Sequence, residues 1–158
     1  MGRQPMTVDA LLAREAIRDL VTRYNSNGDT GRFETLRELF AEHAVMELAR
    51  TDGTLDIYNG REKLMEIFTA AKDRTSSHAA ATTSARPTYL RHMTATHQID
   101  LVDDDHANGR CYFAVYMANG LDHWGRYIDR YVRIDGVWFF EFRRVHVDDS
   151  AAGSWFSA

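Results

Sequence analysis

Four side chains in this sequence are of the types that move a proton at a substrate: Tyr24, Asp29, His92 and Arg143. An imidazole exchanges protons near neutral pH, and a carboxylate beside it can orient the ring. A phenol and a guanidinium donate hydrogen bonds to an oxygen atom on which negative charge develops. Gathered in one apolar pocket, the four groups could abstract a proton and allow another group to leave or rearrange.

Each of the four also has a purely structural interpretation. Asp29 stands where a helix-capping or turn residue is expected, and Tyr24 has the spacing of a core aromatic residue. A histidine in a strand, such as His92, can be a hydrogen-bonded structural residue. Arg143 and Arg144 are consecutive, so in a strand they point to opposite faces, and the surrounding pattern leaves open which one is buried.

The segment that begins at His92 predicts a strand with one polar face. In regular alternation His92, Thr94 and Thr96 share a face. His97 then lies on the opposite face. One face of this strand would therefore carry a titratable ring and two hydroxyl groups.

Metal and cofactor sites are not indicated. The other histidines lack metal-ligand spacing, and the chain has neither a glycine-rich phosphate loop nor a nucleophile elbow. The single cysteine, Cys111, excludes an intrachain disulfide and is expected to be a small buried hydrophobic residue. We therefore predict no metal and no cofactor.

Charge and hydropathy exclude further classes of partner. The formal net charge of −4 gives no support for nucleic-acid binding, which favours a basic face. No apolar run approaches the roughly 20 residues of a membrane span. Residues 1–7 lack the apolar region of a signal peptide. We expect a cytoplasmic protein that binds neither nucleic acid nor membrane.

The elements that must position these side chains can be predicted from periodicity and turn residues. Helices are expected at residues 8–27, 32–41 and 61–72, and strands at 44–50, 55–58, 88–102, 107–119, 123–134 and 137–147. Asn27-Gly28 would end the first helix, which leaves Asp29 in the break before the second. Helices followed by a run of strands indicate an α+β fold whose last four strands form an antiparallel meander.

The 158 residues favour a single domain, 1–158, with two segments outside regular structure. Residues 73–87 are rich in Ser, Thr and Ala and are predicted to be irregular, either a solvated loop or a flap over a pocket. The tail, residues 148–158, is polar except for Trp155 and Phe156. These two aromatic residues predict that the tail docks on the body or on a neighbouring molecule.

The whole pattern resembles the SnoaL-like family of the nuclear transport factor 2-like superfamily. The resemblance covers about residues 10–147, and its elements are IRDLVTRY at 17–24, Asp29, LRELFAEHA at 36–44, YNGRE at 58–62, RYIDRY at 126–131 and DGVW at 135–138. It implies a cone-shaped α+β barrel, in which three N-terminal helices pack on a curved, mainly antiparallel sheet that encloses a pocket. The fold hosts many chemistries, so the resemblance constrains the reaction less.

Within the family, the chain resembles two lyase types in particular, hexachlorocyclohexane dehydrochlorinase and bile-acid 7α-dehydratase. The resemblance implies that His92 abstracts a proton and that Asp29 orients it. It implies that Tyr24 assists the departure of a hydroxyl group or stabilises an oxygen atom. It also selects Arg143 over Arg144 as the residue that stabilises developing negative charge. The segment between Gly60 and His92 is longer than in the dehydrochlorinase, which bears on the size and closure of the pocket.

The same resemblance implies an apolar lining for the pocket, formed by Met46, Leu48, Tyr58, Phe113, Val115, Met117 and Tyr127. We therefore expect a cofactor-independent lyase or dehydratase that acts on a hydrophobic cyclic small molecule. An isomerase or polyketide-type cyclase would use the same pocket. A non-catalytic small-molecule-binding protein, or an assembly module like a dioxygenase small subunit, is the alternative from another class. A homo-oligomer, a dimer or trimer, is expected in each case.

Overall fold

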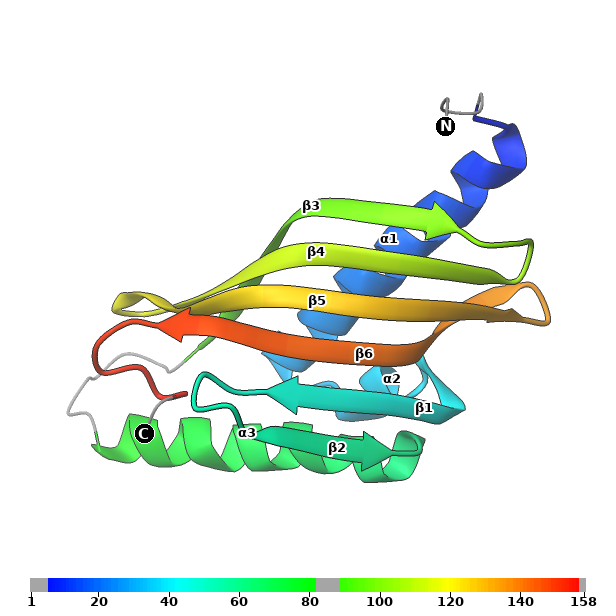
Figure 1. Ribbon diagram of the computed structural model, residues 1–158. Coiled ribbons are helices and arrows are strands. Elements are labelled where there is room, and N and C mark those ends of the chain that lie inside the picture. Colours follow the sequence, from blue (N-terminus) through cyan, green and yellow to red (C-terminus); the bar gives the residue numbers. More distant parts are fainter. Residues whose placement is uncertain (1–5, 82–88, 157–158) are drawn as a thin grey trace.

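A computed structural model describes residues 6–81 and 89–156 (Figure 1). The elements are α1 (Val8–Thr30), α2 (Phe33–Arg37), β1 (Phe40–Ala49), β2 (Leu55–Asn59), α3 (Arg61–Ala81), β3 (Arg91–Leu101), β4 (His106–Met117), β5 (Gly120–Ile134) and β6 (Val137–Ser150). The strands form one sheet in the order β2-β1-β6-β5-β4-β3. Figure 1 shows α1 running behind this sheet and α3 beside its β1–β2 edge.

The predicted α+β fold on a curved, mainly antiparallel sheet is confirmed. Among the strands of the described residues, only β1 and β6 pair in parallel, and the sheet is open, with β2 and β3 at its edges. The predicted meander is present as β3 to β6. Asp135 and Gly136 both have positive φ, 50° and 81°, as a two-residue hairpin turn requires. No helix in the described ranges is both long enough and apolar enough to cross a bilayer.

The first helix is longer than predicted. Thr7 caps its start by accepting a hydrogen bond from Ala10 N (3.1 Å). The prediction that the helix breaks at Asn27-Gly28 is wrong, because α1 continues through both residues. The Asn27 side chain is buried, and its Oδ1 accepts a hydrogen bond from Arg32 Nε at 2.9 Å. The helix ends instead at Gly31, whose left-handed φ of 70° lets its N–H close the last turn.

The second helix is shorter than predicted, and the strand after it begins earlier. Residues 32–41 were expected to be helical, whereas α2 has only five residues and β1 starts at Phe40. Phe140 N donates to Leu39 O (3.0 Å), and the rings of Phe40 and Phe140 lie 5.2 Å apart. Pairing with β6 thus outweighs the local helical spacing.

The third helix continues beyond its predicted end at residue 72. The prediction of irregular structure is wrong for residues 73–81, which are helical. No Gly or Pro occurs between residues 61 and 86, so nothing in the local sequence interrupts the helix. The rest of the predicted flap, residues 82–87, lies outside the described residues.

A bulge in β3 overturns the predicted facing of its histidines. Thr96 has a φ of 56°, and the pairing with β4 shifts register between Ala95 and Gln98. The extra residue reverses the alternation, so His92 and His97 both turn towards the interior. His97 Nε2 there lies 3.3 Å from the buried hydroxyl of Tyr131.

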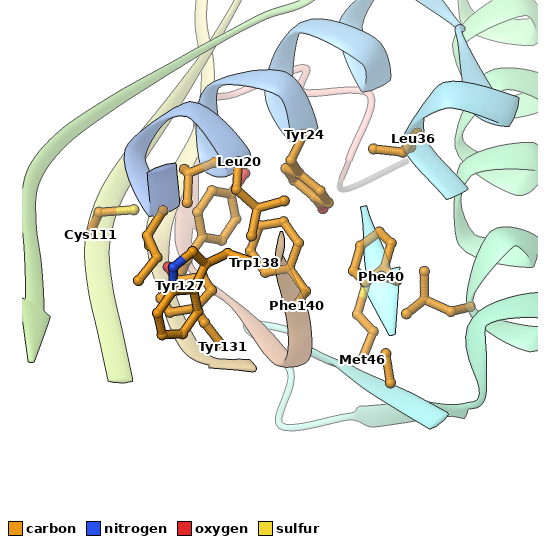
Figure 2. Packing of buried hydrophobic residues seen from close by; sticks show 14 of the residues in the cluster. Leu20, Tyr24, Leu36, Phe40, Met46, Cys111, Tyr127, Tyr131, Trp138 and Phe140 are labelled. Carbon is orange, nitrogen blue, oxygen red and sulfur yellow. The ribbon is translucent and has the colours of Figure 1, made fainter. Parts of the chain in front are cut away.

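The core lies between α1 and the inner face of the sheet. Figure 2 shows the rings of Tyr24, Tyr127 and Phe140 gathered in this space, with Cys111 at one side. Cys111 is buried as predicted, and burial raises the pKa of its thiol to about 11. The tail also docks as predicted, because Trp155 is buried and Phe156 packs against the core.

Two glycines test the packing. Gly28→Ala should raise the free energy of unfolding by roughly 0.5–1 kcal/mol, because this position is helical and an added Cβ would meet nothing within 4 Å. Gly125→Ala should lower the free energy of unfolding by about 3 kcal/mol. Its Cβ would lie 2.0 Å from the carbonyl oxygen of His146. Urea denaturation followed by circular dichroism measures both, and a Gly125→Ala protein of unchanged stability would contradict this packing.

Candidate active site

A cavity of about 370 Å³ lies between the helices and the inner face of the sheet. Its walls come from α1, α2, α3, the strands β1 to β6 and the C-terminal tail. Carbon atoms dominate the lining, which is made by Tyr24, Asn25, Gly28, Asp29, Thr30, Gly31, Phe33, Met46, Leu48, Arg50, Tyr58, Ile67, Phe68, Ala70, Ala71, Lys72, Tyr89, Leu90, His92, Phe113, His123, Tyr127, Val145, Val147, Trp155 and Phe156. Such a cavity suits an apolar ring system approached by a few polar groups.

Asp29 and His92 meet in the wall of this cavity. The imidazole Nδ1 lies 2.5 Å from Asp29 Oδ1, and the backbone N–H of His92 donates to Oδ2 at 3.0 Å. A carboxylate only accepts hydrogen bonds, so Nδ1 carries the proton and Nε2 presents a lone pair. The side chain of Asp29 is 7% exposed and that of His92 is 22% exposed. The imidazole is therefore oriented as a base with its free nitrogen available to a ligand.

The extension of α1 explains this contact. Asp29 occupies the last turn of the helix instead of a break between helices, and α1 packs against β3 at the level of His92. Because β3 begins at Arg91, His92 is at the first inward-facing position of the strand. The bond thus joins a helix end to a strand start that are 63 residues apart.

Arg143 is buried behind the cavity, while Arg144 is on the surface. Arg143 is 0% exposed and donates from Nε and Nη2 to the two oxygens of Asp129, both at 2.8 Å. Although burial acts to lower it, Asp129 holds the pKa of Arg143 well above its ordinary value. Arg144 instead pairs with Glu47 at 2.5 Å, its side chain 41% exposed. The prediction that Arg143 points inward, and not Arg144, therefore agrees with the burial of the two side chains. Arg143 is nevertheless not among the residues that line the cavity.

Tyr24 and Tyr127 separate Arg143 from the cavity. The guanidinium carbon lies 4.1 Å from the centroid of each of these rings and 4.2 Å from that of Phe140. Both tyrosines line the cavity. Burial raises the pKa of Tyr24, although Arg143 opposes this, so its hydroxyl stays protonated and can donate a hydrogen bond. Arg143 therefore acts on the cavity through the two rings that it holds in place.

Five of the seven predicted lining residues do line the cavity: Met46, Leu48, Tyr58, Phe113 and Tyr127.

The prediction is wrong for Val115 and Met117, which are buried but do not reach the cavity. Val115 is opposite His123 in the β4–β5 pair, and the register shifts at the next residue. At this end of the sheet the wall is made by His123, Trp155 and Phe156, which are larger and belong to β5 and the tail.

Several lining groups were missed from the sequence. One is His123, whose Nδ1 lies 2.8 Å from Asp122 Oδ2. Arg50 was also missed; it is paired with Asp56 at 3.0 Å. The adjacent pair Asp122-His123 was a visible signal. The role of this pair could be recognised only once it was known that the His123 side chain projects from β5 into the cavity.

A second concavity of about 320 Å³ borders the Asp29–His92 pair. Besides this pair, its walls are formed on α1 and β3 by Thr22, Asn25, Ser26, Thr30, Arg91 and Thr94. Asp29 and His92 line both spaces.

Known proteins share this fold. Comparison with protein families matches residues 9–144 to the SnoaL-like domain, whereas no curated protein matches. A putative scytalone dehydratase from Novosphingobium aromaticivorans is 21% identical, with 92% of this chain and 91% of that chain covered and a TM-score of 0.72. Hexachlorocyclohexane dehydrochlorinase from Novosphingobium barchaimii is 19% identical, with 92% and 94% covered and a TM-score of 0.72.

A subunit of a larger assembly has the fold as well. The β subunit of a putative aromatic-ring-hydroxylating dioxygenase from Novosphingobium aromaticivorans is 18% identical, with 90% of this chain and 93% of that chain covered and a TM-score of 0.69. At these identities the likeness concerns the fold alone. The side chains of the cavity must therefore distinguish an enzyme from an assembly module.

The buried ion pair gives a stability prediction. Asp129→Asn should lower the free energy of unfolding by about 3–5 kcal/mol, because it leaves the Arg143 charge buried without a counter-charge. Asp19→Asn is the matched control. It removes a surface pair with Arg23 and should leave the free energy of unfolding nearly unchanged, because solvent screens an exposed ion pair. Equal losses in urea denaturation would show that Arg143 is not held by Asp129.

Proposed function

Because this chain belongs to the SnoaL-like family of the nuclear transport factor 2-like superfamily, we propose that it is a cofactor-independent lyase that dehydrates a hydrophobic cyclic small molecule. The observation that carries the proposal is the contact between Asp29 and His92 in the wall of an apolar cavity. The roughly 370 Å³ volume suits one small ring system.

The proposed reaction is elimination of water from a β-hydroxyketone. His92 Nε2 removes a proton from the carbon next to the carbonyl group, and the carbanion is stabilised as an enolate. Its electron pair then forms the carbon–carbon double bond as the β carbon–oxygen bond breaks. The departing hydroxide takes up the proton that His92 Nε2 removed and leaves as water, which returns the imidazole to its neutral form. The base is correctly prepared, because Asp29 holds the proton on Nδ1.

Tyr24 is proposed to donate a hydrogen bond to the oxygen on which charge develops. It lines the cavity five residues before Asp29, and its raised pKa keeps the hydroxyl protonated. Arg143 holds the Tyr24 ring in position and makes the potential around it more positive. In this proposal Arg143 is thus a positioning residue, and Tyr24 is the group that contacts the substrate.

An isomerase or cyclase would use the same base and donor, since both reactions pass through an enolate. The assembly-module alternative needs no buried carboxylate–imidazole pair. The two hydrogen bonds from His92 to Asp29 therefore favour an enzyme over such a module.

The catalytic pair can be tested with a β-hydroxytetralone, whose dehydration yields a fluorescent naphthol. His92→Ala and Asp29→Asn should each reduce kcat/KM by about 10²- to 10⁴-fold, the range expected for loss of general acid–base catalysis. His106→Asn is the matched control, because His106 also pairs with an aspartate (Asp103, 2.9 Å) but on the surface. Unchanged turnover in both His92→Ala and Asp29→Asn would refute the mechanism.

The donor role of Tyr24 has a separate test. Tyr24→Phe removes only the hydroxyl and keeps the ring that covers Arg143. We expect kcat to fall by about 10²-fold with KM nearly unchanged, because the bond strengthens as charge develops. The same fluorescence assay measures both constants. A change in KM alone would indicate that Tyr24 only shapes the cavity.

A further inference from the structure

We propose that His123 is a specificity-determining residue that selects ligands carrying a hydroxyl group. The inference rests on the proposed function in one respect, namely that the cavity is the substrate site. The inference goes beyond the proposed function because it names a second polar group of the substrate, which lies away from the carbon that His92 deprotonates.

The two imidazoles stand in one row across three neighbouring strands. His92 of β3 is opposite Val115 of β4, and Val115 is opposite His123 of β5. Residues in such a row share a face of the sheet, and adjacent strands lie about 4.8 Å apart. The Cα atoms of the two histidines are therefore about 10 Å apart, and both side chains project from the same face of the sheet.

Phe113 provides a common floor between the two imidazoles. Its ring centroid lies 6.3 Å from that of His92 and 6.1 Å from that of His123. All three residues line the same cavity. The three rings therefore border the same part of the cavity.

The orientation of the His123 ring is fixed on several sides. Phe156 stacks on it at 4.8 Å with an interplanar angle of 22°, and Trp155 meets it edge-on at 5.8 Å. Asp122 holds this tail in place by accepting hydrogen bonds from Ser154 Oγ (2.6 Å) and Trp155 N (3.3 Å). The same carboxylate receives Nδ1 of His123 at 2.8 Å. The tail and the imidazole thus share one anchor.

The pairing with Asp122 decides what His123 can offer a ligand. Because the carboxylate accepts, Nδ1 carries the proton, and Nε2 is left with a lone pair. Within the described ranges no hydrogen bond occupies Nε2. Burial lowers the pKa of His123, and the nearby His92 lowers it further against the opposing effect of Asp122. The ring is therefore neutral near pH 7 and acts as a hydrogen-bond acceptor.

A buried acceptor in an apolar wall discriminates between ligands. A hydroxyl group donates to it, whereas an ether or a bare ring leaves the acceptor desolvated and unpaired. The substrate class that fits is accordingly a fused bicyclic compound with a hydroxyl group on the ring that faces β5 and the tail.

Two probes that share one ring system test this assignment by binding alone: a naphthol, which can donate a hydrogen bond, and its methyl ether, which cannot. The unaltered protein should bind the naphthol about tenfold more tightly, as expected for one net hydrogen bond. His123→Asn should bring the two dissociation constants within twofold, because an asparagine amide can still donate to Asp122 but does not reach the position of Nε2. His106→Asn, on the surface, should keep the tenfold ratio. Isothermal titration calorimetry measures the constants, and thermal melting checks the fold.

A measurement without any substitution covers the case in which His123→Asn fails to fold. Nitrogen-15 NMR of the imidazole should show the His123 Nε2 resonance shifting with the naphthol and not with the ether. Equal affinity for both probes in the unaltered protein, or a ratio retained in folded His123→Asn, would overturn the inference and leave the lyase proposal standing. Failure to bind either probe would overturn the assigned substrate class. If the unaltered protein keeps the tenfold ratio of dissociation constants but does not turn over the β-hydroxytetralone, only the lyase proposal would be overturned.

Discussion

A guanidinium group can remain in this core only because its charge and its flat faces are both satisfied. Arg143 and Asp129 are directly opposite each other in the β5–β6 pair, and their side chains form a bidentate ion pair away from water. Tyr24 and two further rings cover the guanidinium. Because Tyr24 belongs to α1, this ion pair fixes where the helix rests on the sheet, and the same helix carries Asp29.

Two imidazoles that line the cavity are each paired with a carboxylate, and the two pairs arise in different ways. Asp29 reaches His92 across 63 residues, and the contact depends on how far α1 extends before Gly31 ends it. Asp122 and His123 are sequence neighbours, and their contact becomes part of the site through the tail that Asp122 binds. In both pairs a buried carboxylate directs the proton to Nδ1, so the chemistry of each ring is determined by its partner.

Local patterns predicted the strands well, because alternation and turn residues act over a few residues. The hairpin at Asp135-Gly136 has the two positive φ values that such a turn needs, and the docking of Trp155 follows from its hydrophobicity in a polar tail. Periodicity alone left Arg143 and Arg144 undecided, and resemblance to a family was needed to choose between them. The errors lie where a long-range pairing outweighs a local preference, as at the start of β1.

The amino-acid sequence by itself determined the α+β class, the order of the elements and the types of chemistry-bearing residues. These depend on composition, periodicity and turn chemistry, which are local. Only the tertiary structure decided that the bulge at Thr96 turns His97 inward, that Val115 stops short of the cavity, and that His123 completes its wall. The reason is that strand register and bulges are set by pairing with distant residues, and a shift of one residue moves a side chain to the other face.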